Sequence, residues 1–172
     1  MNNNFQSPTE AQQRYWQFMI ELTTHIYYLQ TYLFYYQNIE RKIKYFLAIV
    51  SSSAIASWAI WKELNFIWAI LIALSQVINA IKHLLPFAQR EKLIRTILPE
   101  LNIVSSEVEL EYYKVANGII SDQDIHNKTI EFKRKKSNII VKLDENVLPE
   151  RNKFMEEAEE KTKIYFNGYY GG

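Results

Sequence analysis

Two adjacent stretches without a charged residue constrain this chain more than any other feature. The first covers residues 45–61 and the second covers residues 64–81, so only Lys62 and Glu63 separate them. As helices they would be roughly 26 and 27 Å long, which is close to the hydrocarbon thickness of about 30 Å. The sequence therefore predicts a transmembrane helical hairpin, and two buried helices of a soluble bundle are the alternative.

The two stretches differ in apolar content. The second contains ten residues of the Leu/Ile/Val/Phe set, whereas the first contains six, together with four serines. On an insertion scale the ten residues of the second stretch contribute about −3 to −6 kcal/mol. We therefore expect both stretches to insert together, with the second stabilising the first.

Basic residues flank both outer ends of the predicted hairpin, namely Arg41, Lys42, Lys44, Lys82, Arg90 and Lys92. The connection between the two stretches holds one lysine beside one glutamate. Because basic residues concentrate on the cytoplasmic side of a membrane, this distribution predicts that both termini are cytoplasmic. We expect a multi-pass protein of the bacterial inner membrane.

The rest of the chain favours long helices, because it has only four glycines and four prolines. We expect an all-α membrane protein in three parts. These are an N-terminal cytoplasmic amphipathic helix at residues 1–44, the hairpin at 45–85 with spans 45–61 and 64–81, and a cytoplasmic helical tail at 86–172.

Local signals predict where the helices begin and end. Ser7 is the expected N-cap of a first helix that runs without a breaker into the first span. Pro99 is expected to end the helix after the hairpin, and a new helix is expected to begin at 106–109. Two further helices are predicted from Ser121 to about residue 143 and from Pro149 to Gly168.

Apolar residues in the first helix recur with alternating spacings of four and three. They form a heptad seam of Tyr15, Met19, Leu22, Ile26, Leu29, Leu33 and Tyr36. Such a seam packs either against the chain's own C-terminal helices or between subunits, and the two arrangements are compatible. We expect a homo-oligomer.

No residue pattern points to catalysis. The chain has no cysteine, and its three histidines are scattered, so we expect no metal site and no cofactor. It also lacks the glycine-rich phosphate loop and the common hydrolase motifs, so we expect no enzymatic activity. Twenty basic residues nearly balance nineteen acidic ones, which gives no support for nucleic-acid binding.

Two groups of polar residues remain as candidate functional positions. The basic cluster Lys133, Arg134, Lys135 and Lys136 is either a solvated helix face or a surface for phospholipid head groups or a phosphate-bearing messenger. The second group lies in the predicted spans and consists of Ser53, Ser57, Ser75, Gln76 and Asn79. Because buried amides in lipid need partners, these residues either bond across helices or line a water-filled path in an oligomer.

The predicted tail contains a spacing that bears on a family resemblance: Gly118 lies shortly before Ser121 and Asp122. The final helix region reads Pro149, Phe154, Ala158, Glu159, Tyr165, Phe166 and Tyr169. With the preceding helix and hairpin, this order resembles the SLATT proteins, two-transmembrane effectors of bacterial anti-phage systems.

The resemblance implies an effector without catalytic residues. Such a protein would oligomerise and permeabilise the inner membrane when an upstream sensor or a nucleotide messenger activates it, which arrests an infected cell. The residues themselves leave an alternative open, a non-catalytic membrane scaffold that recruits a cytoplasmic partner through its tail.

Overall fold

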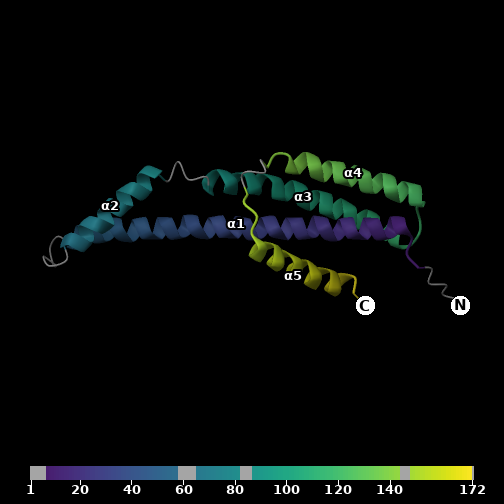
Figure 1. Cartoon of the computed structure of the whole chain (residues 1–172), viewed down its shortest axis with the longest axis horizontal. Helices are drawn as coiled ribbons and strands as arrows, with labels where there is room; N and C mark the ends of the chain where they lie inside the picture. Colours follow the sequence, from purple (N-terminus) through teal and green to yellow (C-terminus); the bar gives the residue numbers. More distant parts are fainter. Residues whose placement is uncertain (1–6, 58–64, 82–86, 144–147, 172) are drawn as a thin grey trace. The chain divides into compact units, whose positions relative to one another are not determined.

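The structure, a computed structural model, describes residues 7–57, 65–81, 87–143 and 148–171. Within these ranges the chain is helical and contains no strand, which confirms the all-α prediction (Figure 1). The helices are α1 (Glu10–Ser57), α2 (Asn65–Ile81), α3 (Phe87–Ala116), α4 (Asp122–Ile140) and α5 (Asn152–Tyr169).

The chain divides into two compact units. Unit 1 combines Met1–Leu33 with Leu93–Gly172, and unit 2 is Phe34–Lys92. Helices α1 and α3 therefore each contribute residues to both units, whereas α4 and α5 belong to unit 1 and α2 belongs to unit 2.

Unit 1 is a helical bundle whose core lies between α1 and α3. The largest fully buried side chains include Tyr15 and Leu22 from α1 and Leu101 from α3. Helix α4 covers this pair through Phe132, whose ring lies edge-on to Tyr15 with centroids 6.4 Å apart. Helix α5 packs on α1 through Phe166, which meets Trp16 at 5.0 Å.

The first helix begins later than predicted. Thr9, not Ser7, caps α1: the backbone N–H of Gln12 donates to Oγ1 of Thr9, and the N–H of Thr9 donates to Oε1 of Gln12. This reciprocal pair is a capping box, and it satisfies two backbone donors at the helix end. The continuity of the helix up to Ser57 agrees with the prediction.

The prediction that Pro99 ends a helix and that another begins at 106–109 is wrong. Helix α3 continues through Pro99 to Ala116. A proline inside a helix costs about 3 kcal/mol. Ile97, Leu98 and Leu101 are buried around it, and burying each such side chain gains about 1.5–3 kcal/mol. Packing therefore outweighs the local penalty.

The other boundaries in unit 1 follow local chemistry. Helix α3 ends just before Gly118, whose φ of 62° is the left-handed conformation that favours glycine at a helix C-terminus. Ser121 caps α4, as predicted, and accepts a hydrogen bond from the backbone N–H of Asp124 at 3.2 Å. Helix α5 begins at Asn152, three residues after Pro149.

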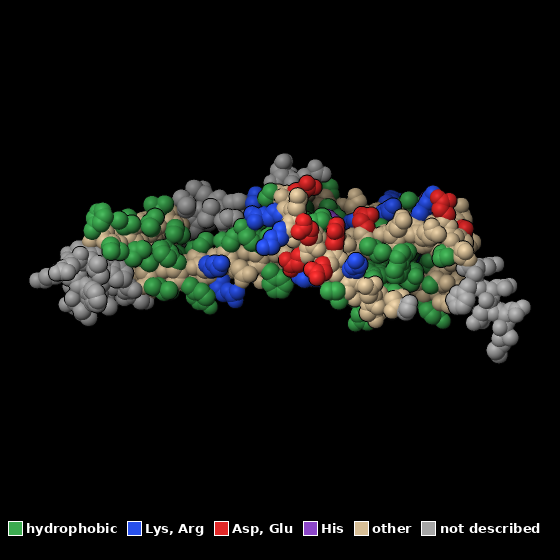
Figure 2. All heavy atoms as spheres, turned by 60° about the horizontal axis from the view of Figure 1, so that its bottom comes forward, with side chains coloured by type: hydrophobic (Ala, Val, Ile, Leu, Met, Phe, Trp, Pro, Cys, Tyr) green, Lys and Arg blue, Asp and Glu red, His purple; other side chains and the backbone are tan. Residues whose placement is uncertain are grey.

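Unit 2 differs from unit 1 in its surface. The described side chains of α2 include no charge, and most of its large apolar side chains are exposed. Figure 2 shows these hydrophobic side chains gathered over α2. None of the helices in the described part of the chain combines the length and the apolar character needed to cross a membrane.

Candidate functional site

The predicted heptad seam of α1 lies mostly inside the protein. Tyr15, Met19, Leu22, Ile26, Leu29 and Tyr36 are buried, and Leu33 is half-buried. In unit 1 the hydroxyl of Tyr15 donates a 2.8 Å hydrogen bond to the carbonyl oxygen of Val108. In unit 2 Arg90 donates to the hydroxyl of Tyr36 at 3.5 Å. The N-terminal part of the seam therefore packs against the chain's own α3 and α4.

The basic cluster does not form one surface. The ammonium of Lys135 forms ion pairs with Glu107 at 2.7 Å and with Glu131 at 3.4 Å, and the hydrogen bond to Glu107 raises the pKa of Lys135. Lys136 pairs with Glu21 of α1. Lys133 and Arg134 are exposed, the Lys135 side chain is partly exposed, and Lys135 and Lys136 connect α4 to its neighbours.

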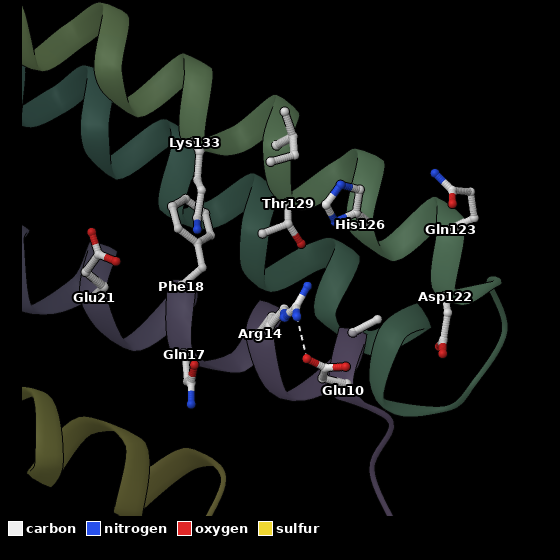
Figure 3. Close-up of a pocket in the computed structure, with 12 residues that line it drawn as sticks. Glu10, Arg14, Gln17, Phe18, Glu21, Asp122, Gln123, His126, Thr129 and Lys133 are labelled. Carbon is white, nitrogen blue, oxygen red and sulfur yellow. Dashed lines mark hydrogen bonds and ion pairs between the residues drawn. The ribbon is translucent and has the colours of Figure 1, made fainter.

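A groove of about 560 Å³ runs between α1 and α4 (Figure 3). Phe18 and Lys133 point toward one another across it, and the ammonium lies 6.0 Å from the ring centroid. The walls carry Arg14, Glu10, Glu21, Asp122, Gln123 and His126. Arg14 is paired with Glu10. Positive and negative groups therefore alternate along the groove, and no single charge dominates it.

A second groove, of about 910 Å³, lies where α1 begins and α3 ends. Its aromatic wall is formed by Trp16 and Tyr112, whose ring centroids are 5.2 Å apart. Tyr170 of α5 closes the cluster, with centroids 5.4 Å from Trp16 and 5.5 Å from Tyr112. The rings contact one another directly, so they form a packed, partly exposed aromatic cluster at the edge of the bundle.

The polar residues predicted for the spans are distributed unevenly. Ser75 is buried, and its hydroxyl donates to the carbonyl oxygen of Ile72 at 2.8 Å. The side chains of Gln76 and Asn79 are exposed on α2. Ser53 and Ser57 fall within α1, but their side chains lie outside the described residues.

Comparison with known proteins adds no relative. No family model, curated protein or solved structure matches this chain. The resemblance to SLATT proteins therefore stays a prediction from the sequence, and function has to be argued from the side chains themselves. Among the described residues, no group of three or more His, Asp or Glu side chains is arranged to hold a metal ion.

His25 is a half-buried residue that no sequence motif singled out. Its Nε2 is inaccessible and has no hydrogen-bond partner within the described part of the chain. Burial, with a smaller contribution from the Lys136 ammonium, lowers the pKa of His25 to about 4, against an opposing effect of Glu21. The sequence holds one signal for this environment. His25 directly precedes Ile26 of the heptad seam, and the positions beside the seam carry no permanently charged residue.

Proposed function

We propose that this chain is a membrane effector. Unit 2 inserts into the bilayer as a helical hairpin, and assembled chains permeabilise the membrane when an upstream sensor or nucleotide messenger acts on unit 1. The observation that carries the proposal is the exposure of large apolar side chains on α2, in a helix that carries no charge.

Five of the six exposed large apolar residues among the described side chains of α2 lie on one side, and the sixth, Ile72, lies on the other. At 100° per residue, Phe66, Ile67, Ile70, Leu74 and Val77 lie within one third of the helix circumference. All five are exposed, and Phe66 is 78% exposed. In water such a continuous apolar face is unfavourable, since each buried side chain of this kind gains about 1.5–3 kcal/mol. A lipid environment removes that cost.

A second side of α2 carries amides. Gln76 and Asn79 are exposed and lie opposite the apolar face, and Ser75 and the half-buried Leu71 and Ile78 lie between the two. A helix with lipid-compatible residues on one side and amides on the other suits a subunit in an assembly. The apolar side faces lipid, and the amides meet other subunits or water.

The seventeen residues of α2 rise about 26 Å, which approaches the hydrocarbon thickness of about 30 Å. The residues on both outer flanks add basic side chains, of which Arg41, Lys42, Lys44 and Lys92 are exposed. These residues favour anionic head groups on the cytoplasmic side. The layout that resembles the SLATT proteins supports the same assignment.

Membrane insertion is tested by extraction of native membranes. We expect the full-length chain to stay in the pellet after alkaline carbonate washing and to be released by detergent. Two matched double variants test the apolar face of α2. Phe66→Lys combined with Val77→Lys should release the chain from the membrane. Ile119→Lys with Ile164→Lys places two charges on exposed positions of unit 1 and should leave it in the pellet. Recovery of the native chain in the carbonate supernatant would show that the proposal is wrong.

Permeabilisation is tested with purified chain in vesicles that hold a self-quenching dye. Native protein should release dye, and replacing both Gln76 and Asn79 with leucine should suppress the release. Gln123 and Asn127 provide the control, because they are an exposed amide pair on α4, joined by a 3.2 Å hydrogen bond. Their double leucine variant should leak as the native chain does. Anchored chain that never leaks at any protein-to-lipid ratio would contradict the effector and favour the membrane scaffold.

A further inference from the structure

The outer side of α3 in unit 1 carries a second heptad pattern, and this one is exposed. Alternating spacings of three and four connect seven positions, and the side chain at every one of them is exposed: Thr96, Pro99, Ile103, Ser106, Leu110, Tyr113 and Asn117. We call these residues the α3 stripe. Its large apolar members are among the most exposed in the chain, at 61% for Ile103, 72% for Leu110 and 68% for Tyr113.

The spacing indicates what kind of surface fits the stripe. A repeat of 3.5 residues keeps side chains in register with a second helix, whereas a flat surface needs no such period. The inner side of α3 is already occupied, because Ile97, Leu101, Val104 and Val108 face the bundle core. The partner of the stripe is therefore a helix from outside unit 1.

The charges beside the stripe select a second copy of the same helix. In a parallel pair of helices, the residue directly before each heptad position a lies close to the residue five places further along on the other helix. On α3 this rule matches Arg95 with Glu100 of the second copy, and Glu109 with Lys114 of the second copy. Twofold symmetry repeats both pairs, so four attractive contacts flank the stripe, and the remaining match of Asn102 with Glu107 is neutral in sign.

An antiparallel pair of α3 helices would be less favourable. With Ile103 opposite Tyr113, Glu107 would meet Glu107 of the second copy and Glu109 would meet its own copy, and these two repulsions offset the two Glu100–Lys114 attractions of that register, whereas the parallel pair has attractions alone. Like charges placed together destabilise such an interface. The charge pattern therefore favours the parallel arrangement.

We propose that α3 pairs in parallel with α3 of a second copy of this chain through the α3 stripe. This deepens the proposed function and rests on it in one respect: insertion brings the copies onto the same side of one membrane. Confinement in the membrane also raises the effective concentration, so that a single helix face suffices for association.

The contacts that the flanking residues make within the chain do not prevent this association. Glu109 accepts hydrogen bonds from the Tyr165 hydroxyl at 3.0 and 2.9 Å, and its carboxylate has further acceptor positions for Lys114 of the second copy. Glu100 contacts Lys142 at 2.7 Å, and Lys114 contacts Glu111 at 3.0 Å. All four side chains are partly exposed to solvent. Pairs of this kind contribute little stability, so they can share or exchange partners at small cost.

A cysteine placed in the stripe tests the pairing directly, because the native chain has no cysteine. Ser106→Cys nearly preserves the shape of the exposed Ser106 and would face its own copy in a parallel pair. Ser137→Cys is the matched control, an exposed serine on α4 away from the stripe. After mild oxidation of membranes that contain full-length protein, we expect a disulfide-linked dimer for Ser106→Cys and monomer for Ser137→Cys.

Two further variants in the Ser106→Cys background test the contacts. Leu110→Lys should abolish the dimer band. Glu109→Lys converts two attractive pairs into repulsions and should lower the dimer yield about tenfold, and adding Lys114→Glu should restore it. Circular dichroism checks that each variant remains folded, as expected for changes at exposed or half-buried positions.

The outcomes separate this inference from the proposed function. If both cysteine variants remain monomeric in protein that stays in the membrane after carbonate washing, the α3 pairing is overturned and insertion stands. If carbonate washing releases the protein but the Ser106→Cys variant still forms the disulfide-linked dimer, insertion is overturned and the pairing stands. A Glu109→Lys dimer yield equal to that of the parent would contradict the parallel register.

Discussion

Replacing His25 with phenylalanine should remove a specific pH dependence from the stability of this protein. The folded chain holds the imidazole neutral, with its pKa lowered to about 4 by burial, whereas in the unfolded chain the pKa is near the ordinary value of 6.5. Acid therefore protonates the unfolded state first. The stability contributed by neutral His25 is complete above pH 6.5 and is lost as the pH falls toward 4.

The magnitude follows from the two pKa values. Between pH 7.5 and pH 5.0 the unfolded histidine takes up its proton almost completely, and the folded one hardly does, which costs the native state about 2 kcal/mol. The hydrogen bond from Lys136 lowers the pKa of Glu21, so this neighbouring carboxylate remains ionised between pH 7.5 and pH 5.0.

Urea denaturation of the full-length chain in mild detergent, followed by circular dichroism, measures this effect. With a slope of about 2 kcal/mol/M, the native midpoint should fall by about 1 M between pH 7.5 and pH 5.0. The His25→Phe midpoint should change much less. His126→Phe is the control, since His126 is exposed on α4, and it should keep the native dependence.

A His25→Phe variant that loses stability with acid as steeply as the native chain would refute the reasoning. A second readout covers the case in which this variant folds poorly. The ring protons of His25 in the native protein, followed by NMR, should show no titration between pH 7.5 and pH 5.5. A midpoint near 6.5 would mean that the imidazole is not buried.

Three further changes test the bundle. Tyr15→Phe leaves the carbonyl oxygen of Val108 without its 2.8 Å donor and should lower the free energy of unfolding by about 1–2 kcal/mol, measured by urea denaturation. Ser121→Ala removes the cap of α4 and should cost about 1 kcal/mol, seen as faster hydrogen exchange of the Asp124 amide, and unchanged exchange there would contradict the assigned cap. Pro99→Ala removes a ring that an α-helix interior accommodates poorly and should raise the melting temperature, whereas a lower one would mean that Pro99 stabilises α3 through packing.

The sequence predicts the helical class and several boundaries of this protein because those features depend on local chemistry. A serine followed by acidic residues caps α4, and a glycine with positive φ follows α3. Pro99 shows where local reasoning fails. The cost of a proline in a helix is local, but the burial that offsets it comes from residues distant in the chain.

The basic cluster illustrates the same limit at a candidate site. In the sequence, residues 133–136 form an uninterrupted run of four cations. On a helix, consecutive residues point in four different directions, so the run cannot form one face. Two of its members meet Glu107 and Glu21, which come from different helices, and no short-range pattern contains that information.

The two heptad patterns of unit 1 show that spacing alone does not distinguish a core from an interface. The seam of α1 and the stripe of α3 have the same period, yet the first is buried and the second is exposed. The flanking residues differ. The positions beside the α1 seam hold Trp16, Phe18, Thr23, His25, Gln30, Tyr32 and Gln37, without a permanent charge.

The positions beside the α3 stripe hold Arg95, Glu100, Asn102, Glu107, Glu109 and Lys114. Uncharged flanks allow further helices to close over a seam, which α4 and α5 do on α1. Charged flanks resist such burial because desolvation of each ion is costly, but they remain compatible with a two-helix contact whose edges stay in water. The flanks therefore explain why α1 is the centre of the bundle, and they are compatible with the proposed pairing of α3 with a second copy.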